Sequence, residues 1–311
     1  MKNIRFIIFF LVLGLGVLLL FLTTKEAKQE PQKPTVAVTT FALYDITTHI
    51  AGNTLNVINI LPFGVDPHSF EPTPKLMAAI EKSALIIYSG AGLEPWVHGF
   101  NFHAKVIDMS RYVKLRKLKA NEHELHDHHD EQCLHTTVDP HYWLDFDNMK
   151  KATVVITDAL TALLPQNKAF YEANKQRYIA MLERLEKEYR TQLSHCKAQS
   201  VVVSHNALGY LADRYGFHVD SLSGLSPEAQ PSAKDVARIM KSIEKEGVTT
   251  IFFEHFVNDS VIKRIAKDTH ITLDVFQPLG NITKDEAAQH MTYETIMEQN
   301  LQKLSKALMC N

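Results

Sequence analysis

The sequence predicts an α/β protein of two lobes, each a mostly parallel four-stranded sheet with flanking helices, linked by a long backbone helix. Three observations lead to this fold class. Short β-branched apolar runs alternate with helical stretches in both halves of the chain, which is typical of parallel sheets covered by helices. One long amphipathic stretch, residues 165–197, separates the two halves. The length of 311 residues, with 45% apolar and 22% charged residues, suits two globular domains.

The first lobe is expected to span residues 35–164. Its predicted strands are the apolar runs 35–39, 55–61, 84–88 and 105–108. Thr73 is a predicted helix N-cap, because Pro74 follows at the first helical position, where a missing N–H costs nothing. Helical periodicity resumes near Asp147, after a polar segment.

The linking helix is expected over residues 165–196, and it leads into a second lobe at 198–311. Its apolar stripe recurs at spacings of four, three, four and four residues: Tyr178, Leu182, Leu185, Tyr189 and Leu193. Strands are then predicted at 200–204, 217–222, 249–254 and 271–277, with helices starting near Ser232 and Asn258. The pattern Thr283-x-x-Glu286 is a capping box and predicts the start of the final helix.

The N-terminal segment predicts export. Lys2 and Arg5 precede the uncharged apolar run 6–22, so residues 1–34 are expected to be a signal peptide, or a membrane anchor, followed by a tether. The rest of the chain would then lie outside the cytoplasm, in the periplasm. In such an oxidising compartment Cys196 and Cys310 could form a disulfide, which spacing alone does not decide. The net charge of −2 favours no nucleic-acid partner.

Three histidines occupy positions typical of a ligand site. His205 directly follows the strand 200–204, and His68 follows the strand 55–61 after a short turn. Ligands of open parallel sheets bind beyond the carboxyl ends of the strands. His141 lies in a second Asp-Pro-His segment of the first lobe, so two lobes would supply three imidazoles to one Zn²⁺ ion. Asp66 and Asp139, which precede the two prolines, are interpreted as turn formers, and Asp145 as a carboxylate that could orient a histidine.

A second group of histidines lies in the polar segment 121–135 (NEHELHDHHDEQCLH), which also holds five acidic residues and Cys133. Such a composition is typical of a solvated segment, but it also binds metal at several places. We interpret its histidines as a capture site that raises the local zinc concentration: His123, His126, His128, His129 and His135.

The segments DPHSFEPTP, DPHYWLD and SHNALGYLADRYG, together with QPLG, resemble those of the metal-binding proteins of zinc and manganese ABC importers, and of the zinc-specific ZnuA type most. The resemblance extends over residues 35–311. It implies that His68, His141 and His205 are the metal ligands, that Zn²⁺ is the transported ligand, and that a membrane permease is the partner. Manganese members are similar but place a Glu where this chain has His205, which favours zinc.

One departure from the family pattern concerns the fourth ligand. The family commonly has an Asp in a DPLG segment, where this chain has Gln277. The fourth position is therefore left open between Gln277, Glu254 and water. The sequence predicts a monomeric zinc-binding protein that is not an enzyme. The alternatives are a manganese- or iron-binding member of the same family, and a zinc-dependent hydrolase, in which Glu254 would be the candidate general base.

Overall fold

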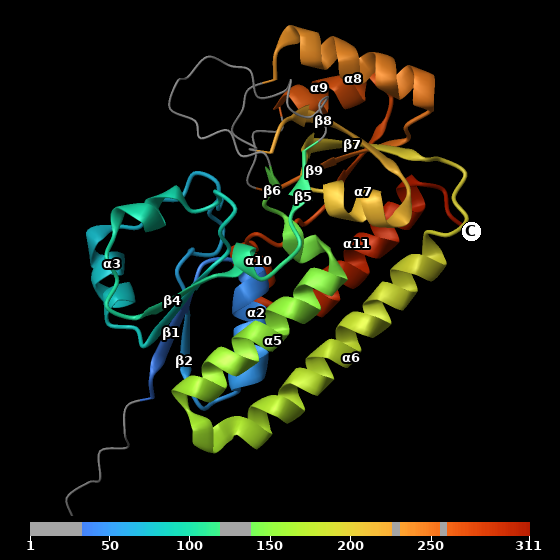
Figure 1. Ribbon diagram of the computed structural model, residues 1–311. Helices are drawn as coiled ribbons and strands as arrows, with labels where there is room; N and C mark the ends of the chain where they lie inside the picture. Colours follow the sequence, from blue (N-terminus) through green and yellow to red (C-terminus); the bar gives the residue numbers. More distant parts are fainter. Residues whose placement is uncertain (1–32, 119–137, 226–230, 256–259) are drawn as a thin grey trace, which may run out of the picture. The chain divides into compact units, whose positions relative to one another are not determined.

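Two parallel four-stranded sheets form the framework of the protein (Figure 1). The computed structural model describes residues 33–118, 138–225, 231–255 and 260–311. The apolar segment 6–22, the histidines of 121–135 and Cys133 lie outside these residues. Within the described part of the chain, no helix combines the length and apolar character needed to span a bilayer.

The first sheet has the strand order β2-β1-β3-β4, and all of its pairings are parallel. Its strands are β1 (Thr35–Val38), β2 (Asn56–Asn59), β3 (Leu85–Tyr88) and β4 (Lys105–Asp108). The connecting helices include α2 (Phe41–Ala51) and α3 (Pro74–Glu81). The predicted cap of α3 is confirmed, because the Thr73 hydroxyl accepts the backbone N–H of Leu76 at 3.3 Å.

The second sheet has the order β10-β9-β7-β8, again with parallel pairings throughout. Its strands are β7 (Ser200–His205), β8 (His218–Ser223), β9 (Thr250–Phe253) and β10 (Thr272–Val275). They alternate with α7 (Gly209–Tyr215), α8 (Ala233–Glu246) and α9 (Ser260–Thr269). Counted in chain order, both sheets are arranged 2-1-3-4, so the two halves share a topology although their sequences show no repeat.

A group of long helices joins the two sheets. Helices α5 (Phe146–Leu163) and α6 (Lys168–Gln192) pack side by side, and both also pack against α2 (Figure 1). The predicted apolar stripe of α6 is buried. Two of its tyrosine hydroxyls form hydrogen bonds to other helices: Tyr178 donates to Asp45 at 2.7 Å, and Tyr189 donates to the carbonyl of Met297 at 2.8 Å. One face of the linking helix is therefore part of the core from Tyr171 to Tyr189.

Two predicted helix boundaries are wrong. The long helix is shorter than the expected 165–196, because Pro165–Asn167 form a separate 3₁₀ turn before α6 and the helix ends at Gln192. The capping box at Thr283 starts only the short helix α10 (Lys284–Ala288). The final helix, α11 (Tyr293–Ala307), begins later, because Thr292 forms a second capping box with Thr295.

A disulfide joins Cys196, which follows α6, to Cys310, which follows α11. The backbone N–H of Ala198 donates to the carbonyl of Leu308 at 3.0 Å, which pairs the same two segments. The pairing that the sequence left open is thus present, and it fastens the C-terminus to the start of the second half.

Candidate metal centre

His205 owes its position to the topology of the second sheet. It is the last residue of β7, the first strand of that sheet in chain order, and it is 2% exposed. Strand β9 pairs with β7 on the side away from β8, so the loops after β7 and β9 leave the sheet side by side. Glu254 comes directly after β9, which places its carboxylate beside the imidazole of His205.

His68 and His141 are each positioned by an Asp-Pro-His turn. In the first, Oδ1 of Asp66 accepts the backbone N–H of His68 at 3.0 Å. In the second, Oδ1 of Asp139 accepts the backbone N–H of His141 at 2.9 Å. A side-chain oxygen that bonds two residues ahead is the Asx turn that Asp favours. Both Asp residues are turn formers, as the sequence predicts.

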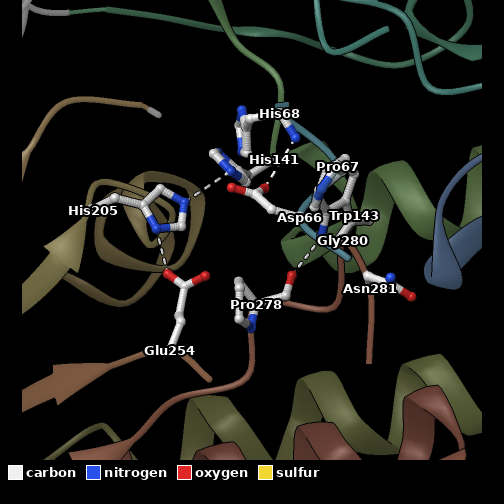
Figure 2. A pocket seen from close by; sticks show the side chains of 10 residues that line it. All are labelled: Asp66, Pro67, His68, His141, Trp143, His205, Glu254, Pro278, Gly280 and Asn281. Atoms are coloured by element: carbon white, nitrogen blue, oxygen red, sulfur yellow. Dashed lines mark hydrogen bonds and ion pairs between the residues drawn. The ribbon is translucent and has the colours of Figure 1, made fainter. Parts of the chain in front are cut away.

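The three imidazole rings lie around a common centre (Figure 2). One potential ligand atom from each of His68, His141 and His205 lies within 4.8 Å of the others. The ring centroids are separated by 5.2 Å for His141 and His205, 5.3 Å for His68 and His141, and 5.6 Å for His68 and His205. His141 is 1% exposed, whereas His68 is only partly buried, so the cluster opens to solvent on the side of His68.

Two carboxylates determine which ring nitrogens face the centre. Oδ1 of Asp139 lies 2.8 Å from Nδ1 of His141, and Oε1 of Glu254 contacts Nδ1 of His205. A carboxylate accepts a hydrogen bond, so each Nδ1 carries the hydrogen and each Nε2 presents its lone pair. The two Nε2 atoms lie 3.3 Å apart. Two lone pairs at this distance repel each other unless a proton or a metal cation lies between them.

The surroundings shift the proton affinities of two of the rings. Burial lowers the pKa of His68 well below its usual value, and the neighbouring His141 and His205 lower it further. Burial also acts to lower the pKa of His205, but the Glu254 carboxylate outweighs it and the pKa is raised. His68 is therefore neutral at physiological pH, which is the form that binds a metal ion.

The floor of the site is built from segments far apart in the chain. Trp143, 1% exposed, donates its indole N–H to the carbonyl of Pro278 at 2.6 Å. Gly280 packs so closely that a Cβ at this position would lie 3.0 Å from the ring of Pro67. Figure 2 shows these residues around the histidines. This packing connects the segment after β10 to both Asp-Pro-His turns.

Two other candidate residues, Gln277 and Asp145, have partners away from the histidine rings. Gln277 is turned away from the histidines, because its amide nitrogen donates to Glu286 at 2.9 Å and its oxygen accepts the N–H of Leu279 at 3.3 Å. Asp145 does not orient a histidine; it caps α5 through the N–H of Asn148 and pairs with Arg214 at 2.8 Å.

The orienting role belongs to Asp139, which sequence reasoning assigned only to a turn. The repeated Asp-Pro-His spacing was the available signal, because a turn that bonds the histidine backbone also brings the carboxylate near the ring. Arg116 lies 3.5 Å from the other oxygen of Asp139, and Tyr210 donates to its backbone carbonyl at 2.9 Å. Arg116 thus holds the carboxylate of Asp139, and Tyr210 fixes its backbone against the second half of the chain.

The donor set fits a zinc ion. In a tetrahedral zinc site with bonds of about 2.0–2.1 Å, two ligand nitrogens lie about 3.3–3.4 Å apart, which matches the 3.3 Å between the Nε2 atoms of His141 and His205. The carboxylates on the far side of two rings increase the basicity of the ligands and hold their orientation.

The protein has two sheets of like topology, a group of joining helices, and a cluster of three histidines of which two are buried. These features define a two-lobed binding protein of the helix-linked class. The chain belongs to the ZnuA family: the family model described as "Zinc-uptake complex component A periplasmic" matches residues 36–307.

The relatives include two bacterial proteins that are named for zinc binding or zinc uptake. The chain is 32% identical over 298 residues to the zinc-binding lipoprotein AdcA of Streptococcus pneumoniae, a match that covers 93% of this chain and 58% of that protein. It is also 32% identical over 292 residues to the high-affinity zinc uptake system protein ZnuA of Bacillus subtilis, covering 92% of this chain and 91% of that protein.

The solved structures include the Zn(II)-bound ZnuA-like domain of Streptococcus pneumoniae AdcA. It matches with a TM-score of 0.73 and 30% identity, and the match covers 89% of this chain and 99% of that domain. The chain therefore spans little more than half of full-length AdcA but nearly all of its ZnuA-like domain.

Proposed function

We propose that this chain binds Zn²⁺ through one ring nitrogen each of His68, His141 and His205, and delivers the ion to the membrane permease of an ABC importer. Residues 35–164 would supply the first two ligands and residues 198–311 the third, with 165–197 as the linker. The periplasm is the proposed location, in line with the family description. We propose that the protein acts as a monomer.

One observation carries the metal assignment. The Nε2 atoms of His141 and His205 face each other at 3.3 Å, while both Nδ1 atoms are held by carboxylates. A shared cation relieves the repulsion between two such lone pairs. Three neutral imidazoles suit Zn²⁺ better than Mn²⁺, which prefers oxygen ligands. Since both ends of the Gln277 amide are engaged and Glu254 contacts Nδ1 of His205, we propose that water completes the tetrahedron.

A binding role is favoured over hydrolysis by the position of Glu254. A zinc hydrolase needs a base that can take a proton from the metal-bound water. Glu254 is the acidic residue that the sequence offered for this role, but its carboxylate contacts the ring nitrogen of His205 that points away from the centre. The same contact suits a residue that holds a ligand in place.

The test is a metal analysis of the purified full chain and of two variants. His205→Ala is expected to lose one tightly held zinc ion per chain. His103→Ala removes a histidine whose side chain is 86% exposed, and it should lose none. Retention of that ion in His205→Ala would contradict the ligand assignment, and tighter binding of Mn²⁺ than of Zn²⁺ by metal-free protein would contradict the metal.

The segment 121–135 is proposed to capture zinc for this centre, on the strength of its composition. Deletion of the segment should reduce the number of weakly bound zinc ions in a titration and leave the tight one in place. An unchanged stoichiometry would exclude capture by this segment.

A further inference from the structure

A second group of potential metal ligands lies on the other half of the chain. One ligand atom from each of His218, Asp220 and Glu246 lies within 4.8 Å of the others, and Nε2 of His218 is 3.6 Å from Oδ1 of Asp220. Among the described residues, the three-histidine centre and this group are the two sets that meet this spacing. Neither the sequence motifs nor the proposed transport of zinc uses these three residues.

The local fold brings them together. His218 and Asp220 are the first and third residues of β8, so the pleat places both side chains on the same face. Glu246 is the last residue of α8, which packs against β8. Two contacts fix this packing: the hydroxyl of Ser242 donates to Oδ2 of Asp220, and Arg238 donates to the carbonyl of Ser221 at 2.7 Å.

One oxygen of each carboxylate lies close enough to the imidazole of His218 for the three side chains to share a cation. Because Ser242 holds Oδ2 of Asp220, Oδ1 is the oxygen directed towards His218. Oε2 of Glu246 is shielded from water and has no hydrogen-bond partner among the described residues. A buried carboxylate oxygen without a partner is costly, and a bound cation would remove that cost.

One nearby charge opposes a cation. Nη1 of Arg238 lies 3.5 Å from Oδ1 of Asp220. This is a long contact, and the other end of the guanidinium is held by the carbonyl of Ser221. The two carboxylates carry a charge of −2 and the guanidinium carries +1. The group is therefore still negative before a divalent ion binds, and the local charge does not exclude the ion.

This group is separate from the three-histidine centre. In the register of the second sheet, His218 pairs with Ser200 and Ser223 pairs with His205. The two groups thus lie at opposite ends of adjacent strands, five residues apart, which is about 17 Å at the usual rise of a strand. Each can bind an ion without sharing a ligand.

From this geometry we propose that His218, Asp220 and Glu246 form a second divalent-cation site, which takes Zn²⁺ with one imidazole, two carboxylates and water. Mixed nitrogen and oxygen ligands of this kind are common for zinc. The His218 side chain is 53% exposed, so the ion enters directly from solvent and binds more weakly than at the buried centre.

The experiment is a titration of the full chain with ZnCl₂, following the number of ions bound. The variant His218→Asn/Glu246→Gln is expected to bind one ion fewer in the weaker class and to keep the tight one. His103→Asn/Glu81→Gln is the matched control, since it removes another histidine and glutamate 3.7 Å apart on the surface. The segment 121–135 is present in all three proteins, so its contribution cancels in the comparison.

A crystal soaked in ZnCl₂ then locates the ion by its anomalous signal. A peak among the three side chains supports the site, and the absence of a peak there at full occupancy of the three-histidine centre overturns it. An unchanged stoichiometry in His218→Asn/Glu246→Gln would overturn it as well. The His205→Ala variant should keep this weaker ion, so failure of the second site and failure of the proposed function give different results.

Discussion

The disulfide between Cys196 and Cys310 is expected to contribute several kcal/mol to the stability of the protein. The two residues are 114 positions apart, so the bond closes a long loop in the unfolded chain. The chain-entropy relation gives about 5 kcal/mol at 25 °C for a loop of this size. Loss of the bond leaves the flanking backbone hydrogen bonds, such as Ala198 N–H to Leu308 O at 3.0 Å, so the folded structure should persist.

Urea denaturation of the Cys196→Ser/Cys310→Ser variant, followed by circular dichroism, measures this contribution. The free energy of unfolding should fall by about 3–5 kcal/mol, with a decrease in melting temperature of roughly 10 °C. Cys133→Ser is the control, because it removes the cysteine outside the disulfide and should leave stability unchanged. A loss below about 1 kcal/mol in the double variant, or an equal loss in the control, would refute the argument from loop length.

Two further predictions concern buried carboxylates. Asp139→Asn should weaken zinc binding about 10- to 100-fold, because it removes the carboxylate that holds Nδ1 of His141. Asp145→Ala should instead lower stability by about 1 kcal/mol as a lost helix cap, and equal zinc affinities of the two variants in a chelator competition would contradict this. Burial raises the pKa of Glu94 from 4.5 to about 7, so the folded state holds this proton more tightly than the unfolded state. The free energy of unfolding should therefore fall, by an amount of order 3 kcal/mol, as the pH rises from 4.5 to about 7. Urea titrations near pH 5 and pH 7.5 should show that Glu94→Gln reduces this fall, and an identical pH dependence of the variant would argue against it.

The local signals in the sequence account for much of the fold. Helix α3 starts where Thr73 and Pro74 predict, and α8 starts after Ser232, whose hydroxyl accepts the N–H of Asp235. The strands were recognisable because short β-branched runs alternate with amphipathic stretches in both halves. Local signals failed where two of them compete: Thr283 and Thr292 both cap a helix, and the chain between them takes a left-handed turn at His290, with φ of 55°.

The three histidines could be proposed from the sequence because each lies in a motif at a strand end or an Asp-Pro-His turn, and those positions converge in a parallel sheet. The sequence by itself thus determined the fold class and the segments that bring the three histidines together. Only the tertiary structure decided which partner each polar side chain contacts. Asp139 rather than Asp145 orients His141, Glu254 contacts His205, and the amide of Gln277 donates to Glu286. The physical reason is that a side chain's partner depends on how segments far apart in the chain pack together, and composition and spacing do not contain that information.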